Sequence, residues 1–128
     1  MSSRLTGLTP MLETPDLAGT AAFYESVLGF ERRGYVEGVW LSVERDGVEI
    51  MFAAPNQHRA FDGPVFSGSL YLRSADIDLA WEELRDKARV AYEIESFDYG
   101  MREFAIYDNN GYMLQFGQPA GETIPSDG

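Results

Sequence analysis

The first 30 residues have the pattern of a short strand followed by an amphipathic helix. Residues 5–12 predict the strand. Thr14 is expected to cap the helix N-terminus, with Pro15 in the first helical position and Asp16 at the positive end of the helix dipole. Gly29 is expected to end the helix. The apolar side chains between them recur every three to four residues and predict one buried stripe: Leu17, Ala21, Tyr24 and Leu28.

Three strands are predicted after this helix, over residues 31–36, 39–44 and 48–53. Glu37-Gly38 and Asp46-Gly47 separate them, and Asp-Gly is a strong signal for a hairpin turn. A loop over residues 54–66 follows.

The same order of elements then recurs. Residues 69–73 predict a strand, and Ser74 and Asp76 repeat the capping residues of the first helix. Three more strands are predicted over residues 91–97, 101–107 and 112–117, with Asn110-Gly111 as the last turn, and residues 119–128 predict a polar, mobile tail. The stripe of the second helix is formed by Ile77, Ala80, Trp81, Leu84 and Ala88.

The chain therefore contains two copies of strand–helix–strand–strand–strand. Thr9 and Ser69 are equivalent at a spacing of 60 residues, and Met51 and Gln115 at 64. A length of 128 residues favours one domain, with module one at about 5–54 and module two at about 67–118. We expect an α+β fold in which two βαβββ modules form a half-open, eight-stranded mixed barrel with a concave interior suited to a small molecule.

Composition excludes several classes of function. The formal net charge of −11 argues against nucleic-acid binding, which needs a basic surface, and favours the attraction of cationic small molecules. No apolar run is long enough to span a membrane, and no signal peptide is predicted. The chain has no cysteine, which fits a cytoplasmic protein, and its one histidine, His58, excludes a multi-histidine metal site. His58 falls in the long loop and is expected to be solvated.

Five motifs together resemble the vicinal oxygen chelate superfamily, which includes glyoxalase I, extradiol dioxygenases and bleomycin-resistance proteins. The resemblance covers about residues 5–118. Its motifs are Thr14-Pro-Asp-Leu, Ala22-Phe-Tyr, Val27-Leu-Gly-Phe30, Gly100-Met-Arg-Glu-Phe104 and the closing hairpin with its strand at residues 108–118. The fourth motif most resembles the bleomycin-resistance branch.

The resemblance also identifies four positions to test for a metal site. Enzymes of the superfamily place one ligand, a His, Glu or Gln, on the first and fourth strands of each copy. These positions are occupied here by Thr9, Met51, Ser69 and Gln115. Such a set offers no negative charge to a hard divalent ion, so we expect neither a bound metal nor a cofactor. Glu49 is the one carboxylate expected near the site.

Without a metal, the concave face is expected to be a binding cleft lined by alternating strand positions. Aromatic and methionine side chains suit a flat or irregular apolar guest. In bleomycin-resistance proteins an aromatic residue, often Trp, precedes the Gly-x-Arg-Glu-Phe stretch, and here it is Tyr99. Arg102 and Glu103 must face opposite sides of their strand, so one of them is expected to face the cleft. The predicted binding residues are Thr9, Trp40, Glu49, Met51, Ser69, Tyr71, Tyr99, Arg102, Phe104 and Gln115, with Met11, Met113 and Phe52 as further candidates for the cleft or the core.

Three functions remain open. The first is metal-free binding and sequestration of a small, possibly antibiotic, organic molecule by a homodimer with clefts at its interface. The second is an enzyme, a glyoxalase-like lyase or isomerase or a ring-cleaving dioxygenase, with a metal held by other residues or with Glu49 as the base. The third is a packing or regulatory role for a degenerate member of the superfamily.

Overall fold

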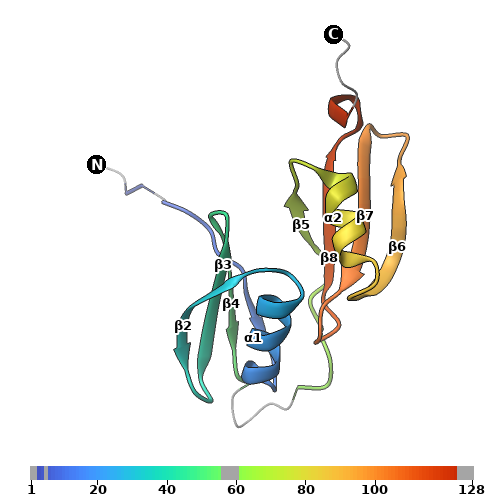
Figure 1. Cartoon of the computed structure of the whole chain (residues 1–128). Helices are drawn as coiled ribbons and strands as arrows, with labels where there is room; N and C mark the ends of the chain where they lie inside the picture. The colour runs from blue at the N-terminus through green and yellow to red at the C-terminus, as the bar shows by residue number, and fades with distance from the viewer. Residues whose placement is uncertain (1–2, 5, 56–60, 124–128) are drawn as a thin grey trace. The chain divides into compact units, whose positions relative to one another are not determined.

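The structure is a computed structural model that describes residues 3–4, 6–55 and 61–123. The chain forms two compact units, Met1–Asp62 and Gly63–Gly128, and each is described by itself. Each unit contains one helix and one mixed four-stranded sheet (Figure 1). No helix in the described part of the chain is long and apolar enough to cross a membrane.

In the first unit the strand order is β1-β4-β3-β2. β1 runs parallel to β4, and the other neighbours are antiparallel. The elements are β1 (Met11–Glu13), α1 (Leu17–Ser26), β2 (Glu31–Val36), β3 (Trp40–Arg45) and β4 (Val48–Ala53).

The second unit repeats this arrangement with the order β5-β8-β7-β6, in which β5 runs parallel to β8. Its elements are β5 (Leu70–Arg73), α2 (Ile77–Leu84), β6 (Arg89–Ser96), β7 (Met101–Tyr107), β8 (Met113–Pro119) and a 3-10 helix, η1 (Ala120–Thr123). The expected α+β class with two βαβββ modules is therefore confirmed.

The strand register shows that the first and fourth strands of the two units pair in equivalent positions. Met11 pairs with Met51 in the first unit, and Tyr71 pairs with Gln115 in the second. Thr9 and Ser69 each lie two residues before the paired position. The alignment of Thr9 with Ser69 and of Met51 with Gln115 therefore follows from the pairing of the strands.

One face of each sheet packs on the helix of its unit. In the first unit the Tyr24 ring of α1 meets Phe52 of β4 edge to face, with ring centroids 5.1 Å apart. In the second unit Trp81 of α2 packs on Phe104 of β7, at 5.2 Å. We call the opposite side of each sheet its open face. Because side chains alternate along a strand, the neighbours of these core residues point to the open face.

Four details of the sequence-based expectations are wrong. Asp16, not Thr14, caps α1: its Oδ1 accepts from the Gly19 N–H at 2.8 Å, whereas the Thr14 hydroxyl accepts from the Asp16 N–H. The first strand begins at Met11, because Pro10 has no N–H to offer a neighbour and residues 6–8 are exposed. Ala88 lies beyond the end of α2 at Leu84.

The fourth correction concerns the C-terminal segment. Pro119 ends β8, and Ala120 begins η1, where its N–H donates to the Gly100 carbonyl at 2.8 Å. This part of the expected tail is therefore folded against β7 and β8. The rest of the expected tail, residues 124–128, lies outside the described residues.

Candidate functional site

A buried carboxylate lies at the centre of the open face of the second unit. Glu103 of β7 is only 3% exposed, and its two oxygens accept hydrogen bonds from three tyrosine hydroxyls. Tyr71 of β5 donates at 2.7 Å, Tyr92 of β6 at 2.8 Å, and Tyr99 of the β6–β7 turn at 2.7 Å. We call Glu103 and these three residues the tyrosine cluster. Three separate elements thus converge on one acidic group.

A glycine makes room for one of these tyrosines. Gly117 of β8 lies between β5 and β7 and pairs with Glu103. A Cβ at this position would overlap the Tyr71 hydroxyl and lie 3.2 Å from the Glu103 Cβ. The absence of a side chain at Gly117 therefore allows the Tyr71 phenol to reach across β8 to the carboxylate.

The β6–β7 turn presents a pair of stacked rings, a half-buried Phe97 and an exposed Tyr99. Phe97 and Tyr99 lie almost parallel, at 2°, with their centroids 5.4 Å apart. Gly100 adopts φ 94°, a conformation that favours glycine, and its N–H donates to the Phe97 carbonyl at 3.0 Å. Tyr99 remains 66% exposed, so its ring is available for stacking.

Two of the positions tested above for a metal site, Gln115 and Ser69, are joined to the tyrosine cluster by hydrogen bonds. Gln115 Nε2 donates to the Tyr92 hydroxyl at 2.7 Å, and the Ser69 hydroxyl donates to Gln115 Oε1. Gln115 is therefore bonded at both ends of its amide group. Ser69, Tyr71, Tyr99 and Gln115, which were predicted from the sequence, are brought together with Tyr92 and Glu103, which were not predicted as binding residues.

Within the cluster, the pKa of the carboxylate is lowered and the pKa values of the tyrosines are raised. Burial alone would raise the pKa of Glu103, but the bonds from Tyr99, Tyr71 and Tyr92 outweigh it and hold that pKa below its usual value. The bond to Glu103, with burial, raises the pKa of Tyr99 to about 12. Burial and the same carboxylate raise the pKa values of Tyr71 and Tyr92. At neutral pH the cluster is one carboxylate surrounded by three neutral phenols.

The donor groups at the four superfamily ligand positions do not fit a divalent metal. They comprise two hydroxyls, a thioether and an amide, and none is anionic. Met51 Sδ accepts from the Trp40 indole N–H at 3.3 Å, and Gln115 is bonded as described. Among the described residues, no group of three or more His, Asp or Glu side chains is placed to hold a metal. His58 lies outside those residues.

The open face of the first unit is more apolar around its centre. The Trp40 ring lies over Gly34, where a Cβ would come within 2.6 Å of it, and Met51 borders its indole nitrogen. Met11 of β1 pairs with Met51 and is exposed. Glu49 is exposed on the same face and accepts from the Ser42 hydroxyl at 2.5 Å.

Arg102 and Phe104 lie on the helix-packed face of the second sheet, which removes both from the candidate binding face. Arg102 forms a bidentate ion pair with Asp78 in the first turn of α2, with Nη2–Oδ1 at 2.8 Å, and this ion pair raises the pKa of Arg102.

Phe104 is completely buried between Trp81 and Phe116. Phe52 is likewise buried in the core of the first unit. Glu103 is the member of the Arg102-Glu103 pair that faces the open side.

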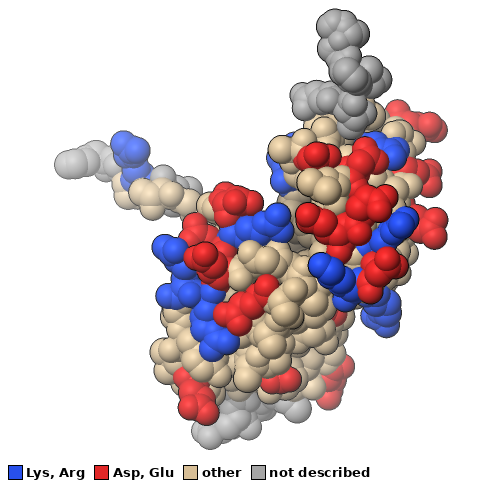
Figure 2. Space-filling model, viewed as in Figure 1, with Lys and Arg blue, Asp and Glu red and all other residues tan. Residues whose placement is uncertain are grey.

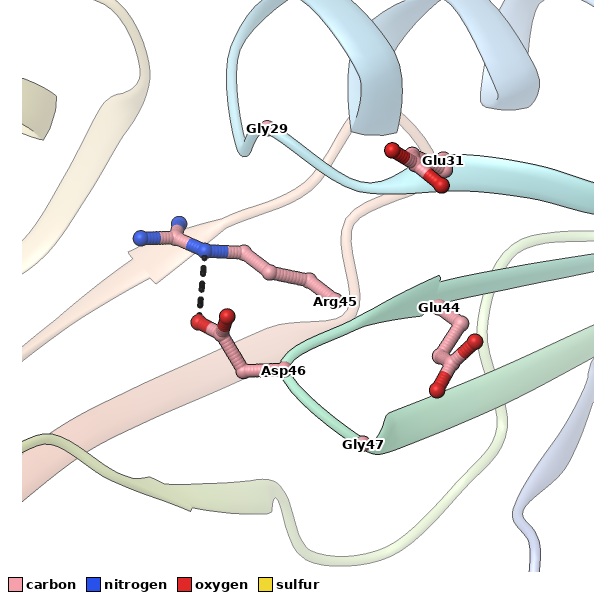
Figure 3. A pocket seen from close by; sticks show the side chains of 6 residues that line it. All are labelled: Gly29, Glu31, Glu44, Arg45, Asp46 and Gly47. Atoms are coloured by element: carbon pink, nitrogen blue, oxygen red, sulfur yellow. Dashed lines mark hydrogen bonds and ion pairs between the residues drawn. The ribbon is translucent and has the colours of Figure 1, made fainter.

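A hollow of about 420 Å³ lies at the β3–β4 turn of the first unit, away from these side chains (Figure 3). Arg45 in its wall donates to the Leu28 carbonyl at 2.7 Å and pairs with Asp46 at 3.3 Å. Glu44 is paired with Arg33. These polar side chains are already partnered, so the hollow is not our candidate site.

Solved structures with the same fold include a bleomycin resistance determinant and a bleomycin-binding protein. The crystal structure of a bleomycin resistance determinant encoded on transposon Tn5 shares 26% identity, covers 90% of this chain and 98% of its own, and gives a TM-score of 0.73. A bleomycin-binding protein complexed with bleomycin shares 26% identity, with coverage of 89% and 98% and a TM-score of 0.72. A glyoxalase/bleomycin resistance protein/dioxygenase from Nocardioides shares 18% identity, with coverage of 99% and 91% and a TM-score of 0.77.

No curated protein sequence matches the chain. The sequence model of one family matches residues 9–116, which include every strand of both sheets except the last residues of β8. The match thus agrees with the repeated modules and with the solved structures. The chain belongs to the glyoxalase/bleomycin resistance protein/dioxygenase superfamily.

Proposed function

We propose that the protein binds and sequesters a small organic molecule, without a metal, on the open faces of its sheets. The observation that carries this proposal is the Phe97–Tyr99 ring pair, of which the Tyr99 ring is exposed, beside the buried Glu103 carboxylate. Stacked rings offer a flat apolar contact, and the adjacent polar cluster orients a ligand. The bleomycin-binding relative, whose structure was solved with bleomycin, supports a ligand of this kind.

The electrostatics of the tyrosine cluster favour binding over acid–base catalysis. A general acid or base works best with a pKa near the working pH. Here the pKa of Glu103 is lowered and that of Tyr99 is raised to about 12, so both groups are moved away from neutrality. The non-anionic donors at the ligand positions support a metal-free site.

Bleomycin and a panel of planar aromatic compounds are expected to raise the melting temperature of the EDTA-dialysed protein. At 100 times the dissociation constant a ligand adds about 2.7 kcal/mol, which is a shift of several degrees. Tyr99→Ala is expected to weaken binding about threefold to tenfold through the loss of ring stacking. The measurement is thermal denaturation followed by calorimetric titration.

Tyr35→Ala is the matched control, because this tyrosine of β2 packs against Arg32 in the first unit and is outside the tyrosine cluster. It is expected to leave the affinity unchanged. If no compound stabilises the protein, the proposal is wrong. If stabilisation or turnover appears only after a divalent metal is added, the metal-dependent enzyme is the better explanation.

We also propose that the protein is a homodimer. The open face of the first unit carries exposed apolar side chains, including Met11 and Val36, at 54% and 51% exposure, and a partner chain would cover them. Light scattering at micromolar concentration is expected to give twice the chain mass of 14.3 kDa. A monomer mass at that concentration would contradict the proposal.

A further inference from the structure

We propose that the tyrosine cluster selects ligands that carry a protonated nitrogen, such as an ammonium, amidinium or guanidinium group. This inference rests on the proposed function and specifies the chemistry of its ligand. It follows from the direction in which each hydroxyl of the cluster donates its hydrogen, and it is independent of the net charge of the chain.

The ionised Glu103 side chain can only accept hydrogen bonds, and each tyrosine hydroxyl has only one hydrogen to donate. Tyr71, Tyr92 and Tyr99 all direct that hydrogen at Glu103. Each hydroxyl oxygen is therefore left with lone pairs alone for any further contact. Tyr71 and Tyr99 are 41% and 66% exposed, so a ligand can approach both residues.

The orientation of the Tyr92 hydroxyl also determines which atoms of Gln115 and Ser69 donate and which accept. Since the hydrogen of Tyr92 points at Glu103, its oxygen accepts from the Gln115 amide nitrogen at 2.7 Å. The Gln115 amide oxygen then faces the Ser69 hydroxyl, which donates to it. The hydrogen of Ser69 is also used, and its oxygen is left as an acceptor. The outward side of the network thus offers acceptors at Ser69, Tyr71 and Tyr99.

The local charge favours the same class of ligand. Among the described residues, no basic side chain forms an ion pair with Glu103, and its carboxylate accepts hydrogen bonds from the three phenols. Glu95, which pairs with it across β6 and β7, adds a second carboxylate. Figure 2 shows acidic and basic side chains interspersed over the visible surface. The exposed Tyr99 ring also offers its face to a cation.

Three probes that share a benzene ring and differ in one group test the inference. Benzamidine is a cation, benzamide is neutral and benzoate is an anion, and all three have similar shapes. In calorimetric titrations at 150 mM salt, which screens long-range charge, benzamidine is expected to bind at least tenfold more tightly than benzoate, with benzamide between them.

Two variants keep the rings and the net charge but remove one outward acceptor each: Tyr71→Phe and Tyr99→Phe. Each is expected to reduce the preference for benzamidine over benzamide about threefold or more, because the charged donor loses more than the neutral amide when an acceptor is removed. Gly117→Ala, which displaces the Tyr71 hydroxyl, is expected to act like Tyr71→Phe. Tyr107→Phe is the matched control, because Tyr107 lies on β7 and its ring packs under Arg89, outside the cluster.

Equal affinity for the three probes, or no binding of benzamidine at millimolar concentration, would overturn the inference. An equal loss in Tyr107→Phe would also overturn it, because the effect would then not belong to the cluster. The proposed function is judged separately. It stands if neutral planar compounds or bleomycin still bind, and it fails if none of them binds.

Discussion

Phe104→Ala is expected to lower the free energy of unfolding by about 3–5 kcal/mol, the range for removing a fully buried aromatic side chain. Phe104 is completely buried, and its ring packs 5.2 Å from Trp81 and 5.2 Å from Phe116. The loss combines the transfer energy of the ring with the cavity left between α2 and the sheet. Urea denaturation followed by circular dichroism measures it.

The ligand affinity of the folded Phe104→Ala protein is expected to remain unchanged, because the ring faces α2 and not the open face. Tyr99→Ala is the matched aromatic truncation: its ring is exposed and leaves no cavity, so it is expected to lose affinity and to lose less stability than Phe104→Ala, namely the contribution of its one hydrogen bond to Glu103. The assignment of Phe104 to the core would be wrong if its variant kept wild-type stability and bound ligand more weakly.

Glu103→Gln is expected to destabilise the protein by about 1.5–3 kcal/mol at neutral pH, the usual contribution of a hydrogen bond to a charged group. The pKa of Glu103 is lower in the folded protein than in the unfolded chain, where it is about 4.3. Its stabilising contribution is therefore fully present above that value and is lost as the pH falls through the folded pKa.

The difference in stability between wild type and Glu103→Gln should accordingly shrink as the pH is lowered from 7 to 3. Urea midpoints across this range measure it. Glu95→Gln is the matched control, because Glu95 is an exposed carboxylate on the neighbouring strand, and a change within about 0.5 kcal/mol is expected. Parallel pH profiles for wild type and Glu103→Gln would show that the tyrosine hydroxyls do not stabilise the ionised carboxylate.

Local sequence signals were sufficient for most of the fold. The bounds of β2, β4 and β7 agree with the predicted ranges, because alternation and Asp-Gly or Asn-Gly turns depend on neighbouring residues. The capping residue of α1 was harder to predict from the sequence, because Thr14 and Asp16 are both suitable capping residues. Asp16 caps the helix since the Thr14 hydroxyl is within hydrogen-bond distance of Thr20 and accepts from the Asp16 N–H.

The site could be predicted only in part. Alternation places Arg102 and Glu103 on opposite faces, but it does not state which face packs on the helix. Tyr92 was not considered from the sequence. Its strand β6 is irregular, with register shifts between Val90 and Tyr92 and again between Tyr92 and Glu95, and such bulges change which residues share a face.

The sequence by itself determined the repeated βαβββ order, the superfamily and the non-anionic character of its ligand positions, because these depend on residue type and on short spacings. Only the tertiary structure decided that Glu103 is the centre of the tyrosine cluster. Its bond to Tyr71 spans 32 positions along the chain, and the bond between Ser69 and Gln115 spans 46. Such contacts exist only after the strands have paired and α2 has covered the other face of the sheet.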